Sequence, residues 1–223
     1  MTGARPPSQT QRATALLREM IVTNRLPPGS NHLETELAAM LGMSRTPVRE
    51  AAIALEAQGL VEVRPRHGIR ILPVSAADME EIYSVLTELE GLAAWNLANA
   101  RPTAVGLAEL TGLVDEMDAA LDAGDRPRWA AADDAFHKAL VRLAGNRRLE
   151  AIVETMSDQV NRARLVTLFL RPEPRGSNDD HRRLIAAIAA GDADAAREIH
   201  RAHRIAAKET MIRLLATHGF AAV

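Results

Sequence analysis

Apolar residues recur at helical spacing through most of the chain, and this pattern predicts an almost entirely helical protein. A first helix follows Ser8, a residue type that caps helix starts, and should end at Pro27-Pro28-Gly29. Two shorter helices are expected at about 34–41 and 44–58, and Gly42 between them can adopt the left-handed conformation that closes helices. Beyond residue 75, proline and glycine separate six further predicted helices, at 76–100, 103–123, 127–144, 148–170, 178–190 and 192–217.

Strict alternation of apolar and polar residues, the mark of a β-strand, is confined to one short stretch. The segments 61–63 and 69–71 alternate around Arg66-His67-Gly68, which predicts a β-hairpin with these three residues at its tip. We therefore predict a mostly α fold, with an N-terminal winged helix-turn-helix and a C-terminal all-α bundle of six or seven helices. The expected boundaries are a flexible tail at 1–7, the winged domain at 8–73 and the all-α domain at 76–223.

Composition narrows the class of protein. Of the 223 residues, 47% are hydrophobic and only 3% aromatic, which favours a helical core rich in alanine and leucine. The absence of cysteine excludes disulfides and thiolate metal ligands. The chain shows neither a signal peptide nor an apolar run long enough to span a membrane, so we expect a soluble, cytoplasmic protein without a membrane partner.

Charge is unevenly divided along the chain. Residues 1–75 carry nine arginines against six glutamates, a net charge of +3, although the whole chain has a formal charge of −2. A basic front on an acidic body suits a protein that meets a polyanion with one end.

Polar residues cluster at the start of the third predicted helix, on the face opposite its apolar positions. They are Ser44, Arg45, Thr46 and Arg49. Arginine can form two hydrogen bonds to guanine, threonine can bond a phosphate or touch a thymine methyl, and free N–H groups at a helix start favour a phosphate. The alternative is that these arginines merely solvate an exposed helix. The preceding turn and the following hairpin together favour a DNA-reading helix.

Four residues in the C-terminal region have side chains suited to a metal ion. Asp133 and His137 lie four apart and so project from one face of their helix, while His181 and His203 belong to two later helices. Three imidazoles and a carboxylate can bind a first-row divalent ion such as Zn²⁺ or Ni²⁺. Spacing alone leaves open that they are ordinary core or surface residues.

The segments ETELAAMLGM, SRTPVREA and LEAQGLV…RPRHG resemble the GntR-type winged helix, and DDAFHKAL…GN with GDADAAREIHRAH resembles the FCD ligand-sensing domain of its FadR-type branch. The first resemblance implies that Arg45, Thr46 and Arg49 contact bases and phosphates, with His67 and Gly68 of the wing near the minor groove. The second implies a divalent metal at the four positions Asp133, His137, His181 and His203.

The FCD resemblance also implies a ligand. A small organic acid or sugar acid would bridge metal and protein, and Arg162, Arg164 and His200 are the candidate contacts to it. We therefore expect a ligand-responsive transcription regulator that binds a palindromic operator as a homodimer. Residues 8–73 would form its DNA-binding domain and residues 76–223 its effector-binding and dimerisation domain. Because ligand-induced release of DNA is the commoner response in the family, we expect a repressor. Two alternatives remain. One is a metal-dependent hydrolase, although no general base is evident and a DNA reader would then be idle; the other is a regulator whose metal is purely structural.

Overall fold

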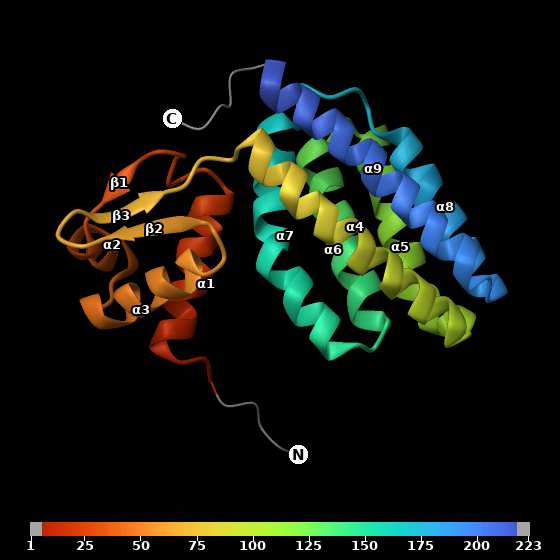
Figure 1. The fold of residues 1–223 in the computed structure, drawn as a ribbon, viewed down its shortest axis with the longest axis horizontal. Coiled ribbons are helices and arrows are strands. Elements are labelled where there is room, and N and C mark those ends of the chain that lie inside the picture. Colours follow the sequence, from red (N-terminus) through yellow and green to blue (C-terminus); the bar gives the residue numbers. More distant parts are fainter. Residues whose placement is uncertain (1–5, 218–223) are drawn as a thin grey trace. The chain divides into compact units, whose positions relative to one another are not determined.

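The structure is a computed structural model that describes residues 6–217 (Figure 1). Residues 1–5 of the predicted tail lie outside this range, as do residues 218–223. The chain divides between Val74 and Ser75 into two compact units, a head and a bundle, which are described separately.

The head contains three helices and a small antiparallel sheet, as the hydrophobic pattern predicts. Its elements in chain order are α1 (Gln9–Val22), β1 (Asn31–His32), α2 (Glu34–Leu41), α3 (Arg45–Glu56), β2 (Val61–Arg64) and β3 (Gly68–Ile71). The strands are ordered β1-β3-β2. The two-residue strand β1, which pairs Asn31 with Arg70, was not predicted because so short a segment has no alternation to detect.

Short-range signals set the helix ends of the head. Ser8 accepts a hydrogen bond from the backbone N–H of Gln11, and the Gln11 side chain accepts one from the Ser8 N–H, which completes a capping box. Gly42 has a φ of 63° and closes α2 as predicted. The prediction that α1 reaches Pro27 is wrong, because the helix ends at Val22 and residues 23–30 form turns.

The wing depends on a glycine for a steric reason. Gly68 begins β3 with a φ of 87°, and a Cβ there would lie 2.3 Å from the carbonyl oxygen of His32. Only glycine allows β1 and β3 to approach so closely. The predicted hairpin is confirmed, but its tip lies one residue earlier than expected, because residues 65–67 form the turn between β2 and β3 and Gly68 already belongs to β3.

The bundle is all-α within the described residues. Its helices are α4 (Ala76–Asn99), α5 (Ala104–Asp122), α6 (Arg126–Leu143), α7 (Arg147–Thr167), α8 (Arg175–Ala190) and α9 (Ala193–Thr217). The prediction placed the start of α8 at residue 178, three residues late, so His181 lies in the second turn of this helix and not in the first.

Packing in the bundle pairs α4 with α9 and α5 with α6 (Figure 1). Trp129, Phe136 and Leu140 of α6 are fully buried in its core. No helix within residues 6–217 is long and apolar enough to cross a membrane. The head has a separate core, in which Leu17, Leu37 and the apolar face of α3 come together.

Candidate functional site

The start of α3 presents a polar surface to solvent. Ser44, Arg45, Thr46 and Arg49 are all exposed. Val48, Ala52 and Leu55 on the opposite face are buried, so packing of that face holds the helix in place. Ser44 occupies the N-cap position, but its hydroxyl makes no capping hydrogen bond. The first turn of α3 therefore keeps its polar groups available to an outside partner.

Both arginines of this surface meet one carboxylate. Arg45 Nη2 lies 3.1 Å from Glu34 Oε2, and Arg49 Nε lies 3.8 Å from Glu34 Oε1. Each arginine side chain is 67% exposed, so these ion pairs are weak and solvent-screened. A phosphate or base edge can replace Glu34 at little cost.

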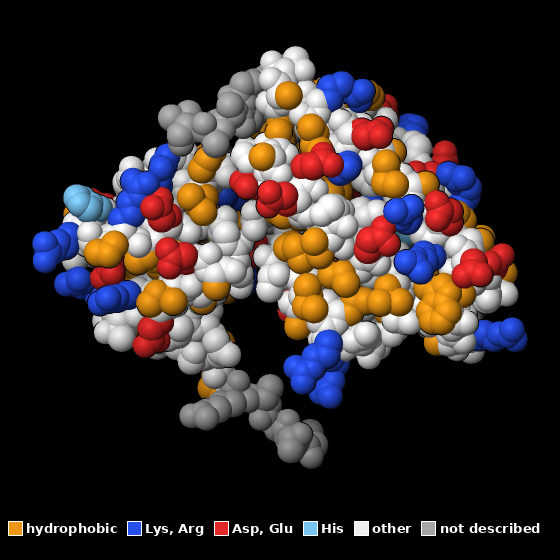
Figure 2. All heavy atoms as spheres, viewed as in Figure 1, with side chains coloured by type: hydrophobic (Ala, Val, Ile, Leu, Met, Phe, Trp, Pro, Cys, Tyr) orange, Lys and Arg blue, Asp and Glu red, His pale blue; other side chains and the backbone are white. Residues whose placement is uncertain are grey.

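The wing extends the basic surface. Figure 2 shows Arg side chains, with a His beside them, gathered over the β2–β3 end of the head. His67 at the tip is exposed, whereas Gly68 is half-buried and has the steric role described above. The helix and wing together form the surface by which a winged helix-turn-helix binds a duplex.

The four predicted metal-binding residues converge in the bundle, although they come from three helices. Nitrogen atoms of His137, His181 and His203 lie within 4.8 Å of one another, and all three residues are buried. Asp133 Oδ1 lies 2.9 Å from His181 Nε2 and 3.8 Å from His137 Nε2. The structure thus brings Asp133, His137, His181 and His203 together.

The chemistry of this cluster fits a divalent metal ion. Nε2 of His137 and Nδ1 of His181 are buried and have no hydrogen-bond partner among the described residues. Buried imidazole nitrogens are costly to leave unsatisfied. Three imidazoles with one carboxylate would bind an ion such as Zn²⁺ or Ni²⁺ and would satisfy them.

A second layer of carboxylates orients the histidines. His137 Nδ1 lies 3.3 Å from Glu90 Oε2, and His203 Nδ1 lies 3.3 Å from Asp180 Oδ2. In each case the other ring nitrogen is left for the cluster, which is the usual arrangement of carboxylate, imidazole and metal. Glu90 also binds His200 Nε2 at 2.8 Å.

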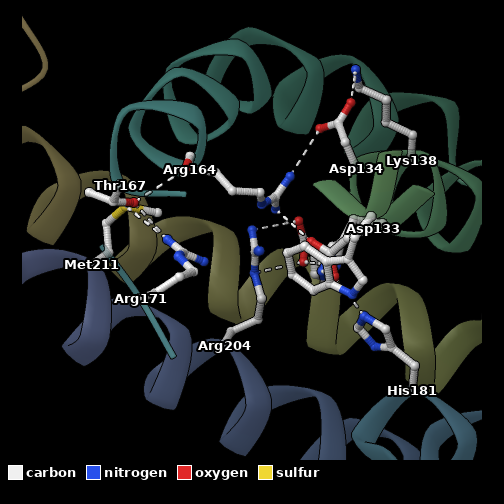
Figure 3. A network of polar contacts seen from close by, with 12 residues as sticks. Asp133, Asp134, Lys138, Arg164, Thr167, Arg171, His181, Arg204 and Met211 are labelled. Atoms are coloured by element: carbon white, nitrogen blue, oxygen red, sulfur yellow. Dashed lines mark hydrogen bonds and ion pairs between the residues drawn. The ribbon is translucent and has the colours of Figure 1, made fainter. Parts of the chain in front are cut away.

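Buried arginines keep the carboxylates ionised. Arg164 Nη2 lies 3.0 Å from Asp133 Oδ2 (Figure 3). Arg204 contacts both oxygens of Glu90, with Nε at 2.9 Å and Nη2 at 3.0 Å. Burial alone would raise the pKa of each carboxyl, but the arginines and histidines lower the pKa of Asp133 and of Glu90 well below the ordinary value.

Burial keeps two histidines of the cluster, His137 and His181, neutral. It lowers the pKa of His181 to about 4, although the hydrogen bond to Asp133 opposes the shift. Burial, together with the charge of Arg204, lowers the pKa of His137 well below its ordinary value. Neutral imidazole is the form that binds metal ions, so the cluster is held in a state ready for one.

A pocket of about 420 Å³ opens beside the cluster. Asp133, His137 and His203 form part of its wall, together with Tyr83 and Trp129. Three arginines also line it, namely Arg164, Arg171 and Arg204. The pocket therefore combines candidate metal ligands, cations and aromatic surface in one cavity.

The three residues predicted to contact a carboxylate ligand are placed differently. Arg164 lines the pocket, as expected. Arg162 is buried on the same helix but does not line it, because residues two apart on a helix point in different directions. His200 is bonded to Glu90 outside the pocket lining. We therefore keep only Arg164 among the proposed ligand contacts.

Sequence reasoning missed Glu90, Arg171 and Arg204. A signal for Glu90 was present, because it falls in the apolar stripe of α4 that runs through Tyr83, Leu86 and Ala94. A carboxylate at such a position requires a buried partner. Arg204 repeats this pattern on the buried face of α9.

A winged helix-turn-helix with exposed arginines on its recognition helix, joined to a helical ligand-pocket domain, defines a DNA-binding transcription regulator. Comparison of the sequence with known protein families leads to the same class of protein. Residues 9–71 match the family described as bacterial regulatory proteins, gntR family, and residues 81–206 match the FCD domain. The chain belongs to the GntR family and carries an FCD domain.

Relatives and solved structures support this assignment. The chain is 48% identical over 130 residues to an uncharacterized HTH-type transcriptional regulator in the TAR-I ttuE-ttuC' intergenic region of Agrobacterium vitis, covering 57% of this chain and 76% of that protein. It is 34% identical to a probable D-xylose utilization operon transcriptional repressor of Paenarthrobacter nicotinovorans, covering 84% and 81%. The structure of E. coli McbR/YncC matches with a TM-score of 0.76 and 26% identity, covering 91% and 98%.

Proposed function

We propose that this regulator is a homodimeric repressor whose affinity for a palindromic operator is set by a small carboxylate bound at a divalent metal ion in the bundle. The observation that carries the proposal is the buried cluster of three histidines and Asp133, because its unsatisfied ring nitrogens border a pocket of about 420 Å³. Asp133, His137, His181 and His203 would hold the ion. The ion would supply open coordination positions for a carboxylate oxygen.

An apolar face on α4 supports the homodimer. Val85, Leu92 and Trp95 are exposed large hydrophobic residues that share one face of this helix, since they are seven and three positions apart. Figure 2 shows hydrophobic side chains gathered over this part of the bundle. A contiguous apolar patch is typical of a protein interface. A two-fold dimer would present two heads to the two halves of a palindrome.

Ligand control requires the two sites to be coupled. A ligand can shift the protein between states that bind DNA well and badly only if its own affinity differs between those states. The same coupling then operates in reverse, so operator DNA must weaken the binding of a ligand that causes release.

The hydrolytic alternative has less support. The carboxylates next to the histidine cluster, Asp133 and Glu90, are both engaged by buried arginines. Neither is therefore placed as a general base for a metal-bound water. The matched families and the relatives above are transcription regulators.

The metal part of the proposal is tested by elemental analysis. We expect about one divalent ion per chain in the wild type and a large loss in His137→Ala and His203→Ala, because each removes one of four ligands. A matched control is His67→Ala on the wing, which should keep the ion. Full occupancy in both cluster variants would contradict the proposal.

The regulatory part is tested on a palindromic duplex selected from random sequence by the full-length protein. Fluorescence anisotropy should show affinity that falls steeply with salt, because arginines displace counterions from the phosphates. Small carboxylates should release the metal-loaded protein from this duplex and should fail after chelation. Release that is independent of the metal would support the purely structural alternative.

A further inference from the structure

The three arginines that line the pocket differ in how their charge is balanced. Arg164 is paired with Asp133, with 3.0 Å between Nη2 and Oδ2, and Arg204 is paired with Glu90 through two nitrogen–oxygen contacts. Both side chains are almost completely buried. These two guanidinium groups therefore have fixed carboxylate partners supplied by the protein.

Arg171 has no such partner. Its Nη2 donates to Thr167 Oγ1 at 2.8 Å and lies 3.7 Å from Met211 Sδ, both uncharged groups (Figure 3). Its Nε is buried and has no hydrogen-bond partner, and no carboxylate within residues 6–217 forms an ion pair with it. Arg171 is half-buried, and partial burial of a guanidinium without an anion is energetically unfavourable, which indicates that something else completes its environment.

The carboxylates in the pocket wall are already committed to other cations. Glu173 Oε1 lies 2.8 Å from Arg175 Nε, and Asp180 is bonded to Arg183 and His203. Asp133 is held by Arg164. When these pairs are set aside, the charge left facing the cavity is that of Arg171 and of the metal ion proposed above.

We propose that the ligand of this pocket is a small aliphatic dicarboxylate, with one carboxylate at the metal cluster and the other accepting hydrogen bonds from Arg171. This inference rests on the metal-assisted ligand site of the proposed function. The fork of a guanidinium group matches the two oxygens of a carboxylate, and such charge-assisted hydrogen bonds are among the strongest in proteins.

The size and walls of the cavity fit such a molecule. Ligand pockets commonly have volumes of about 300–1,000 Å³, and 420 Å³ lies near the lower end of that range. The lining also includes Trp129, Ala206 and Ala207. These side chains suit a short carbon chain better than a third charged group.

A monocarboxylate would fit less well. A monocarboxylate bound at the metal would displace water from the pocket but would offer no anion to Arg171. Part of its binding energy would then be lost to desolvation of the Arg171 charge. The second carboxylate of a diacid would instead form an ion pair with Arg171 and offset this desolvation cost. The structure therefore favours diacids over monoacids of equal length.

Isothermal titration calorimetry on the metal-loaded, full-length protein tests this directly. The probes are malate and 2-hydroxybutyrate, which differ only in that a carboxylate replaces a methyl group, together with malonate, succinate and glutarate to vary the chain length. We expect the best diacid to bind at least about tenfold more tightly than the monoacid, as a charged hydrogen bond allows.

The variant Arg171→Gln should remove this preference. Diacid affinity should fall by about tenfold or more, while the affinity for 2-hydroxybutyrate should not fall and should rise, because the cost of desolvating the Arg171 charge is removed. Arg171→Lys, which keeps the charge, should restore part of the loss and guards against a folding defect in the glutamine variant. The matched control is Arg182→Gln, because Arg182 is an exposed arginine of α8 that does not line the pocket.

The outcomes separate this inference from the proposed function. If monoacids and diacids bind the metal-loaded wild type equally, or if Arg171→Gln leaves diacid affinity unchanged, the dicarboxylate assignment is wrong while the metal-assisted site stands. If no acid in the series binds the metal-loaded protein, both the site and the assignment are wrong.

Discussion

The candidate sites of the head and the bundle place their charged side chains in opposite environments. In the head, the arginines of the recognition surface, Arg45 and Arg49, are each 67% exposed and share one carboxylate. In the bundle, Arg164 and Arg204 are 6% and 3% exposed, and their carboxylate partners are equally buried. The arginines of the head surface are solvated, whereas those beside the histidine cluster of the bundle lie inside the protein.

We attribute this difference to what each region is proposed to bind. A surface that meets a large polyanion needs cations that can change partner at little cost, and exposed ion pairs contribute little to stability. A pocket for a small charged ligand must replace water by fixed charges before the ligand arrives. Its ions are costly to bury and therefore have to be paired. The comparison predicts that equivalent substitutions will have very different effects in the two environments.

The largest effect is expected from Glu90→Ala. This change leaves Arg204 buried without its carboxylate and removes the hydrogen-bond partner of His200. Loss of one partner of a buried pair should lower the free energy of unfolding of the bundle by about 3–5 kcal/mol. Urea unfolding followed by circular dichroism in the presence of chelator measures it.

The matched control is Glu116→Ala, which breaks the exposed pair between Glu116 and Arg128. Because both partners are solvated, the urea midpoint should scarcely move. Equal midpoints for Glu90→Ala and Glu116→Ala would show that the buried network of the bundle does not differ energetically from its surface pairs.

Sequence patterns predicted the helices because their boundaries are encoded locally. Ser8, Gly42 and the other caps and breaks act over a few residues, so they can be recognised without knowledge of the fold. Strand β1 escaped because its two residues are held by pairing with β3, a contact between distant segments. Likewise α1 ends at Val22, five residues before the proline that was expected to stop it.

The site was only partly predictable for a similar reason. Asp133 and His137 are four apart on one helix, and that spacing is visible in the sequence. The environment of Arg171 depends on α7 and α9 meeting at Met211, which no local pattern reveals. The role of Glu90 was partly predictable, since a carboxylate within an apolar stripe indicates a buried ion pair but does not identify the partner.

The buried histidines make the bundle sensitive to acid. Burial lowers the pKa of His181 from 6.5 to about 4, so between these values the unfolded chain binds the proton more readily than the folded one. Stability must therefore fall as pH falls. For His181 alone the loss between pH 7 and pH 5 should be about 2 kcal/mol.

This pH dependence is measured by urea unfolding of the chelator-treated protein at pH 7, 6 and 5. His181→Asn removes the titrating group and should flatten the dependence. If the wild type is equally stable at pH 7 and pH 5, the burial of neutral histidines does not govern the stability of the bundle.

In the head, the corresponding experiment concerns DNA. Arg49→Ala should weaken binding to the selected operator by about 1–3 kcal/mol, because one side chain that reaches bases or phosphates is lost. Arg49→Lys keeps the charge but loses the planar fork, so it separates attraction to phosphate from recognition of a base. Anisotropy at matched salt measures both.

The control for this pair is Arg148→Ala, an exposed arginine of the bundle. Operator affinity should not change in this variant. If Arg49→Ala also leaves the affinity unchanged while Arg148→Ala lowers it, the polar face of α3 is not the reading surface.

The smallest expected effect tests whether the two regions differ in anything besides their charges. Ser8 caps α1 in the head and Thr103 caps α5 in the bundle, each through a side-chain oxygen that accepts a backbone N–H. Ser8→Ala and Thr103→Ala should each lower the stability of their own unit by about 1 kcal/mol. Hydrogen exchange, which reports on the two units separately, measures this. Equal losses of stability would show that the head and the bundle differ in the environment of their charged groups and not in their helix caps. A much larger loss in one unit would show that the helix caps also differ in their contribution to stability.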